Sequence, residues 1–201
     1  PPQPAYILRG HAAAVHAVHF LRRNARLLTA DADGWAVLWA VASRRAVAVW
    51  RAHAASVLGV GSYGLGEEEE EEEEGVRIVT HGRDNALRVW HLPPAAEDGL
   101  STRLPAEIPA AAADPKAPWL LHALAVNTLN FCGFAMCKAP AVLGGRSSLA
   151  PEEQRRRGDG DSEEHVLVAV PGTRDGSVDV FGLPSEKRLC SLPPLESPHT
   201  G

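Results

Sequence analysis

The chain repeats one short pattern three times, which predicts a fold built from stacked copies of one small unit. Each copy opens with a turn dipeptide, Asp-Gly or Asp-Asn, of the kind that tight hairpins need. It then continues as an apolar strand that ends in an aromatic residue. The three copies are 33–39, 84–90 and 175–181, and they align without gaps. Since every copy has the pattern of a strand, the repeat predicts an all-β fold.

A second pattern lies upstream of each copy. There a histidine (His11, His53 or His122) is followed by apolar residues at equal offsets. The distance from this histidine to the terminal aromatic grows in the second and third copies. Polar insertions at about 66–75 and 138–164 account for the growth. Without these insertions, one unit of constant length remains, repeated three times.

The alternation of apolar residues between turn signals predicts four short strands in each unit. Four antiparallel strands joined by tight turns are typical of a β-propeller blade. The units are about 5–50, 51–104 and 119–192. The expected strands are 15–20, 26–30, 36–40 and 46–50, then 57–60, 77–80, 87–91 and 102–104, then 126–131, 166–170, 178–182 and 188–191. A further strand, 5–8, is expected to precede them all.

Three stretches, 66–75, 105–118 and 138–164, are predicted to be disordered. The first contains the run Glu67–Glu74, and without it the net charge of −5 would be slightly positive. A run of like charges cannot bury itself, so a solvated loop is the simplest interpretation. The alternative is a contact for a basic partner such as a histone or a chaperone client. The acidic balance is therefore local and does not identify the partner of the whole domain.

Several function classes find little support in the composition. No apolar stretch approaches the roughly 18 residues that a membrane span needs, so no membrane association is expected. The three cysteines have no CxxC spacing, so neither a disulfide framework nor a zinc site is expected. Residues 59–64 match GxGxxG, but glutamates follow where a phosphate-binding helix should begin. We expect no cofactor and no metal, and no direct contact with nucleic acid.

One set of polar residues recurs at equal spacing in two units. The sets are His11, Thr29, Asp33 and Trp39 in the first unit, and His53, Thr80, Asp84 and Trp90 in the second. A buried carboxylate needs hydrogen-bond partners, and such a set supplies them. A Thr–His–Asp triad for nucleophilic catalysis is the alternative. It is disfavoured because the set occurs twice, whereas an active site occurs once.

The third unit keeps only part of the set, and Trp35 is one of three tryptophans that lie outside the sets. The partial set is His122, Asp175 and Phe181, with a phenylalanine in place of the tryptophan. Trp35 directly follows a predicted turn. An exposed tryptophan at a blade edge is typical of a contact for a partner protein, so Trp35 is a candidate for that role.

The repeated His, Thr, Asp and Trp positions resemble the structural tetrads of WD-repeat proteins. Within that family, the segments 126–132, 168–172 and 182–185 are similar to the ASTRA-associated protein 1 family and its animal relatives, the guanine nucleotide-binding protein beta-subunit-like proteins. This resemblance implies a seven-bladed scaffold about twice as long as this chain, with no catalytic residues. Three blades cannot close a ring, so the chain is expected to be an N-terminal piece.

The resemblance also implies a function and partners. It implies a nuclear subunit of the ASTRA complex, linked to chromatin remodelling. It further implies association with cochaperones and with RuvB-like ATPases that mature phosphatidylinositol-3-kinase-like kinases. The alternatives with the same fold are a substrate receptor and a G-protein-β-like signalling scaffold.

Overall fold

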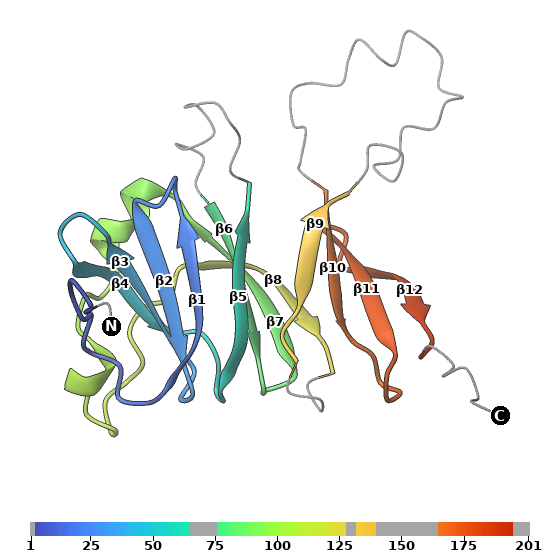
Figure 1. Ribbon diagram of the computed structural model, residues 1–201, viewed down its shortest axis with the longest axis horizontal. Helices are drawn as coiled ribbons and strands as arrows, with labels where there is room; N and C mark the ends of the chain where they lie inside the picture. The colour runs from blue at the N-terminus through green and yellow to red at the C-terminus, as the bar shows by residue number, and fades with distance from the viewer. Residues whose placement is uncertain (1–2, 65–75, 128–131, 140–164, 195–201) are drawn as a thin grey trace, which may run out of the picture. The chain divides into compact units, whose positions relative to one another are not determined.

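The computed structural model describes residues 3–64, 76–127, 132–139 and 165–194. Within them the chain consists mainly of β-strands, which form three antiparallel sheets of four strands each (Figure 1). The all-β prediction is thereby confirmed. The chain divides into two compact units, Pro1–Gly133 and Phe134–Gly201. The first unit holds two of the sheets, and the second unit holds the third.

The first sheet follows chain order, and its strands agree with the prediction to within one residue at each end. They are β1 (Val15–Leu21), β2 (Arg26–Asp31), β3 (Trp35–Ala40) and β4 (Arg45–Arg51). The turn between β2 and β3 requires glycine, because Gly34 has a φ of +88° and a Cβ there would lie 2.0 Å from the carbonyl oxygen of His53. This close approach joins the turn to the linker that enters the second sheet.

The second sheet has its fourth strand far from the predicted place. Its strands are β5 (Val57–Tyr63), β6 (Val76–Gly82), β7 (Ala86–Leu92) and β8 (Trp119–Ala125). The prediction of a strand at 102–104 is wrong, and residues 119–125 belong to this sheet and not to the third. The reason is that β8 pairs with β7 only after a long connection, with Ala125 opposite Ala86.

Apolar side chains from the facing sides of the first two sheets form one core. Leu28, Leu38 and Trp50 come from the first sheet, and Ile78 and Trp90 come from the second. The rings of Trp50 and Trp90 meet edge to face, with centroids 6.3 Å apart and an interplanar angle of 64°. Each of the first three side chains is fully buried. The two sheets therefore share their interior as neighbouring blades do.

Two histidines of β1 join the inner strands of the same two sheets. His16 Nδ1 lies 2.9 Å from the hydroxyl of Ser56, and His19 Nε2 lies 2.9 Å from the hydroxyl of Ser62. Burial lowers the pKa of His19. These hydrogen bonds connect β1 to β5 and to the residue that precedes β5.

The connection from β7 to β8, residues 93–118, is called the strap here, and it packs on the first sheet. It contains two short 3₁₀ helices, η1 (Pro94–Gly99) and η2 (Pro105–Glu107). Glu97 is 7% exposed, and its carboxylate is bound by Arg22 and by Arg26, whose Nη2 lies 2.8 Å from Oε2. These ion pairs connect η1 of the strap to β2 and to the turn that precedes it.

Apolar residues fasten the rest of the strap. Leu104 and Ile108 pack on a cluster that contains Val37, Trp39 and Val49 of the first sheet. The backbone N–H of Val49 donates to the carbonyl of Ser101 at 2.7 Å, so the strap also pairs with the outer edge of β4. The prediction that 105–118 is disordered is wrong. The Ala and Pro content suggested disorder, but apolar side chains of the strap such as Ile108 pack on the first sheet.

The N-terminal segment also differs from the prediction. Residues 5–8 form no strand and pair with none of the strands in the described part of the chain. Leu8 instead packs on the same cluster as Leu104. A strand needs a partner for its backbone groups, and this segment is held by side-chain packing alone.

The third sheet forms the second unit. Its strands are β9 (Ala135–Lys138), β10 (Val166–Pro171), β11 (Val178–Leu183) and β12 (Lys187–Leu192). The last three agree with the prediction, but the first strand was expected at 126–131. Residues 126–127 are not in a strand, and 128–131 lie outside the described residues. The strand that pairs with β10 on the side away from β11 is β9, with Met136 opposite Val168.

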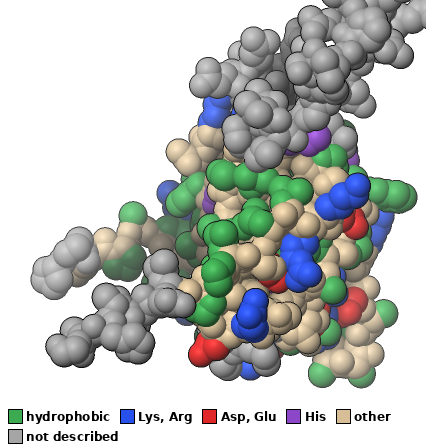
Figure 2. Space-filling view, turned by 90° about the vertical axis from the view of Figure 1, so that its right-hand side faces the viewer, with side chains coloured by type: hydrophobic (Ala, Val, Ile, Leu, Met, Phe, Trp, Pro, Cys, Tyr) green, Lys and Arg blue, Asp and Glu red, His purple; other side chains and the backbone are tan. Residues whose placement is uncertain are grey.

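One face of the second unit carries a band of hydrophobic side chains (Figure 2). On β12 itself, Leu189 and Leu192 are 51% and 52% exposed. The third sheet therefore keeps apolar side chains at its surface. The insertions predicted at 66–75 and 138–164 lie outside the described residues, except for the end of β9 at Lys138 and the residue after it.

Candidate functional site

In the second sheet, the four residues of the repeated set meet in one hydrogen-bonded chain. His53 lies in the linker between β4 and β5, Thr80 lies on β6, Asp84 lies in the next turn, and Trp90 lies on β7. Trp90 Nε1 donates to Thr80 Oγ1 at 2.9 Å. His53 Nε2 lies 2.8 Å from Thr80 Oγ1, and His53 Nδ1 lies 2.8 Å from Asp84 Oδ1. Three separate segments of the blade are thereby tied together.

The chemistry of the four groups sets the direction of these bonds. An indole can only donate and a carboxylate can only accept, so with a neutral His53 the protons run from Trp90 through Thr80 and His53 to Asp84. This order requires a neutral imidazole that carries its proton on Nδ1. Burial lowers the pKa of His53 and so favours that neutral form. The network is therefore satisfied without an ionised histidine.

Arg88 completes this network, and the sequence analysis did not identify it. Its Nη1 donates to the carbonyl of Ala52 at 3.0 Å and to Asp84 Oδ2 at 2.8 Å, which uses both protons of that nitrogen. The same nitrogen lies 2.5 Å from His53 Nδ1. Burial by itself would raise the pKa of Asp84, but the bond from Arg88 and the contact with His53 hold this pKa below its usual value. The sequence signal that could have identified Arg88 is its spacing from Asp84 across a hairpin turn.

In the first sheet, the carboxylate of the network comes from Asp31 and not from Asp33. His11 Nδ1 lies 2.7 Å from Asp31 Oδ2, and His11 Nε2 lies 2.7 Å from Thr29 Oγ1. Trp39 Nε1 donates to the same hydroxyl at 2.8 Å. Asp31 is fully buried, whereas Asp33 is exposed. The assignment of Asp33 to the first set is therefore wrong.

The carboxylate comes from Asp31 because the two sheets differ at the position two residues before the predicted aspartate. Position 31 corresponds to Gly82 in the second sheet, because Thr29 pairs with Val37 as Thr80 pairs with Arg88. A Cβ at Gly82 would lie 2.2 Å from His53 Nδ1, so that place is already filled there. In the first sheet, Asp31 occupies this place. It also accepts the backbone N–H groups of residues 33 and 35, both at 3.0 Å, which leaves the side chain of Asp33 in solvent.

The partial set of the third unit does not form. His122 lies on β8, the last strand of the second sheet, whereas Asp175 and Phe181 belong to the third sheet. The error follows from the displaced fourth strand, which moved His122 into the preceding blade. Asp175 is exposed, and Phe181 is half-buried on β11.

A different carboxylate is buried in the third sheet. Asp179 is 7% exposed on β11 and accepts a hydrogen bond from the hydroxyl of Ser191. Arg188 Nη1 lies 3.4 Å from its other oxygen. All three residues come from the β11–β12 hairpin. This blade therefore holds its carboxylate within one hairpin and not through a distant histidine.

Trp35 is not an exposed contact residue. Its side chain is 9% exposed, within the cluster that the strap covers. The guanidinium carbon of Arg51 lies 5.8 Å from the centroid of its ring. The prediction that Trp35 lies on a free blade edge is wrong, because the strap packs over this face of β3.

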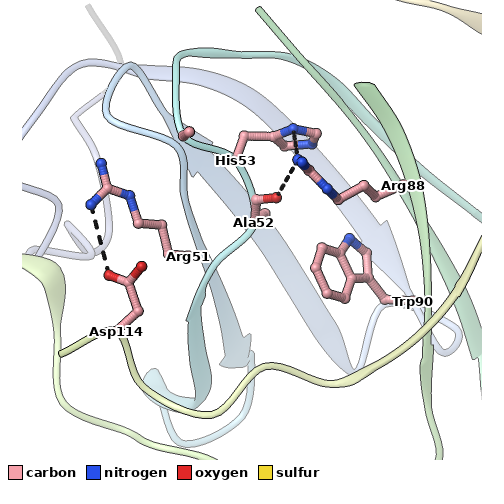
Figure 3. Close-up of a pocket in the computed structure, with 7 residues that line it drawn as sticks. Arg51, Ala52, His53, Arg88, Trp90 and Asp114 are labelled. Carbon is pink, nitrogen blue, oxygen red and sulfur yellow. Dashed lines mark hydrogen bonds and ion pairs between the residues drawn. The ribbon is translucent and has the colours of Figure 1, made fainter. Parts of the chain in front are cut away.

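A pocket of about 420 Å³ opens beside the second network (Figure 3). Arg51 and Asp114 of the strap form an ion pair across its mouth at 3.7 Å. Arg88 and His53 line the inner side, where their polar groups already hold Asp84 and Ala52. Each of the two arginines that line the pocket is thus bound by a carboxylate, Arg51 by Asp114 and Arg88 by Asp84. The arrangement braces the blade and presents no unengaged base or nucleophile beside Arg88.

Other kinds of site find no support in the described part of the chain. No three His, Cys, Asp or Glu side chains gather there in a way that could hold a metal ion. None of the helices in this part combines the length and the apolar character needed to cross a membrane. The GxGxxG segment 59–64 lies mostly within β5, where it pairs with β6.

Comparisons with known proteins add an independent line of information. No protein-family model matches the chain. ASTRA-associated protein 1 of Aspergillus niger is 40% identical over the whole of this chain, and that of Penicillium rubens is 42% identical, also over the whole chain. The Pyricularia oryzae protein of the same name is 44% identical over 94% of it. The chain is a homologue of ASTRA-associated protein 1.

The similarity extends over less than half of these relatives. The chain spans 44% of the Aspergillus niger protein, 43% of the Penicillium rubens protein and 35% of the Pyricularia oryzae protein. Among solved structures, the beta-propeller domain of Myceliophteria thermophila Cps50 (Swd1) is similar at a TM-score of 0.49 and 11% identity, over 89% of this chain and 42% of that one. The resemblance to the ASTRA-associated protein 1 family is confirmed by the curated relatives.

Proposed function

We propose that this protein is a non-enzymatic WD-repeat scaffold and a subunit of the ASTRA complex. The observation that carries the proposal is the match of the whole chain, at about 40% identity, to relatives whose name states an association with ASTRA. A homologous set of blades supports a shared way of assembling with other subunits. Because the chain spans less than half of those relatives, the role of the whole protein is part of the proposal.

The geometry of the blades supports a scaffold and not an enzyme. The Thr–His–Asp groups that resemble a catalytic triad occur in two sheets, and both ring nitrogens of His11 and of His53 lie within hydrogen-bond distance of a structural partner. A catalytic histidine must instead reach the proton of a substrate or nucleophile. These polar groups contribute to the stability of the blades, and binding falls to the surfaces around them.

The finer parts of the proposal concern location and partners. We place the protein in the nucleus, where it would contribute to chromatin remodelling and to the maturation of phosphatidylinositol-3-kinase-like kinases. Its proposed partners are the other ASTRA subunits, cochaperones and RuvB-like ATPases. The proposal includes no cofactor, no membrane and no direct contact with nucleic acid.

Rapid depletion of the protein tests this role. We expect the steady-state amounts of phosphatidylinositol-3-kinase-like kinases to fall after depletion, while the amount of an unrelated kinase stays constant. Re-expression of the full-length wild-type protein should restore them. Re-expression of Asp84→Ala should restore them less, in proportion to its lower stability, since Asp84 binds His53 and Arg88.

Two outcomes would contradict the proposal. Unchanged kinase amounts after complete depletion would remove the link to kinase maturation. Changed amounts of ubiquitin-ligase substrates, or of G-protein signalling, would favour a substrate receptor or a G-protein-β-like scaffold with the same fold.

A further inference from the structure

A groove of about 620 Å³ lies on the first sheet, bordered by the N-terminal segment, the start of β4 and the strap. Its apolar lining is formed by Leu8, Trp39, Ala46 and Leu104. Trp39 is 3% exposed and is fixed in place by its hydrogen bond to Thr29. The groove therefore has an apolar floor built by the N-terminal segment, β3, β4 and the strap.

Positive charge surrounds this floor. Arg9, Arg44 and Arg45 line the groove, and all three are exposed. Among the residues that the structure describes, no ion pair joins any of them to a carboxylate, in contrast to the arginines bound by Glu97. Glu107 is the one acidic residue of the lining, and its Oε2 accepts the backbone N–H of residue 104 at 3.2 Å.

Two exposed apolar side chains lie beside these arginines. Tyr6 and Ile7 are 55% and 54% exposed. The guanidinium carbon of Arg44 lies 4.7 Å from the centroid of the Tyr6 ring. Stacking on an aromatic face reduces the freedom of a guanidinium while its N–H edge remains open to an acceptor. Tyrosine and arginine are also the residues most enriched where protein partners bind strongly.

We propose that this groove binds an acidic, extended peptide segment of a partner protein. Carboxylates of the segment pair with Arg9, Arg44 and Arg45, because a guanidinium matches a carboxylate in two-point contact. One apolar side chain of the segment occupies the floor beside Trp39. The volume lies within the range of about 300–1,000 Å³ that is usual for ligand sites.

A peptide suits the groove better than a nucleic acid does. The floor accepts an apolar side chain, which a phosphate backbone does not offer. The proposal is separate from membership of the ASTRA complex, and either can hold without the other.

Fluorescence anisotropy with the purified full-length protein tests the groove. The probe is a labelled ten-residue peptide of Asp and Glu with one central Leu, and the comparison probe has Asn and Gln in place of the acids. We expect the acidic probe to bind at least about tenfold more tightly, since hydrogen bonds to charged groups exceed neutral ones. The double variant Arg9→Glu, Arg45→Glu should lose this difference.

Controls keep the result interpretable. Arg174→Glu makes the same kind of charge change at an exposed arginine outside the groove and should bind the acidic probe as the wild type does. The milder variant Arg9→Gln, Arg45→Gln removes charge without reversing it and should also weaken binding. Melting curves identify any variant that fails to fold.

Three results would overturn the proposal. Equal binding of the acidic and neutral probes would remove the role of charge. Equal loss in Arg174→Glu and in the groove variants would show nonspecific attraction. Tighter binding of a ten-nucleotide oligo-dT, with the same dependence on Arg9 and Arg45, would make the groove a nucleic-acid site.

Discussion

Asp31→Ala should destabilise the protein strongly, whereas Asp33→Ala should not. Asp31 is fully buried, lies 2.7 Å from the imidazole of His11 and accepts two backbone N–H groups of its turn at 3.0 Å. Its removal leaves three donors without their acceptor. Each buried donor left unsatisfied costs about 1–3 kcal/mol. With partial relaxation and entry of water, we expect a loss of about 3 kcal/mol in the free energy of unfolding, near the upper end of ordinary single mutations.

Thermal and urea unfolding measure this difference. For a domain of this size, a loss of 1 kcal/mol lowers Tm by about 2–4 °C, so Asp31→Ala should melt about 6–12 °C below the wild type. Asp33→Ala changes an exposed side chain and should stay within about 0.5 kcal/mol. A larger loss in Asp33→Ala than in Asp31→Ala would refute the assignment. Asp31→Gly recreates the arrangement of the second sheet, so it should make the free energy of unfolding depend on Asp33.

Three further perturbations test other parts of the structure. Gly82→Ala should destabilise the protein by more than about 1 kcal/mol through overpacking, because the new Cβ would lie 2.2 Å from His53 Nδ1. Gly99→Ala is the matched control, because a Cβ there would meet nothing within 4 Å. Equal melting temperatures of the two variants would contradict this packing. Glu97→Ala should cost about 3–5 kcal/mol because it removes the carboxylate that pairs with the buried Arg22. Limited proteolysis should then cleave the strap, and a protected strap would contradict its attachment through this ion pair. Burial lowers the pKa of His81 to about 4 and also lowers the pKa of His53. As the pH falls, these histidines are therefore protonated in the unfolded chain before they are protonated in the folded protein, which favours unfolding. Urea midpoints should fall as the pH drops from 6.5 towards 4. His81→Gln should flatten this dependence, and an equally steep profile in that variant would contradict the assignment to His81.

The strands could be predicted because their signals are local. Turn residues such as Gly34 and Asn85, together with alternating apolar residues, determine where each hairpin begins and ends. The pairing of His53, Thr80, Asp84 and Trp90 also followed from spacing within one blade, and the structure brings these four side chains together. Such features depend on short stretches of chain that are visible in one sequence.

The errors arose where tertiary contacts decide. Equal spacing in the two sets favours Asp33, and only the burial of Asp31 against His11 shows that Asp31 takes this role. The strap is ordered because Glu97 meets arginines of the first sheet, and no local pattern predicts such a pairing. His122 was assigned to the wrong blade because a histidine before apolar residues is a common pattern, and the strap displaced the strand that carries it.

Affinity purification of the tagged full-length protein from nuclear extract, followed by mass spectrometry, tests the central proposal most directly. The reason is that relatives about 40% identical to this chain are named for an association with ASTRA. We predict recovery of ASTRA subunits together with cochaperones and RuvB-like ATPases, in amounts comparable to the tagged protein. Recovery of ubiquitin-ligase subunits or G-protein partners without any ASTRA subunit would contradict the account.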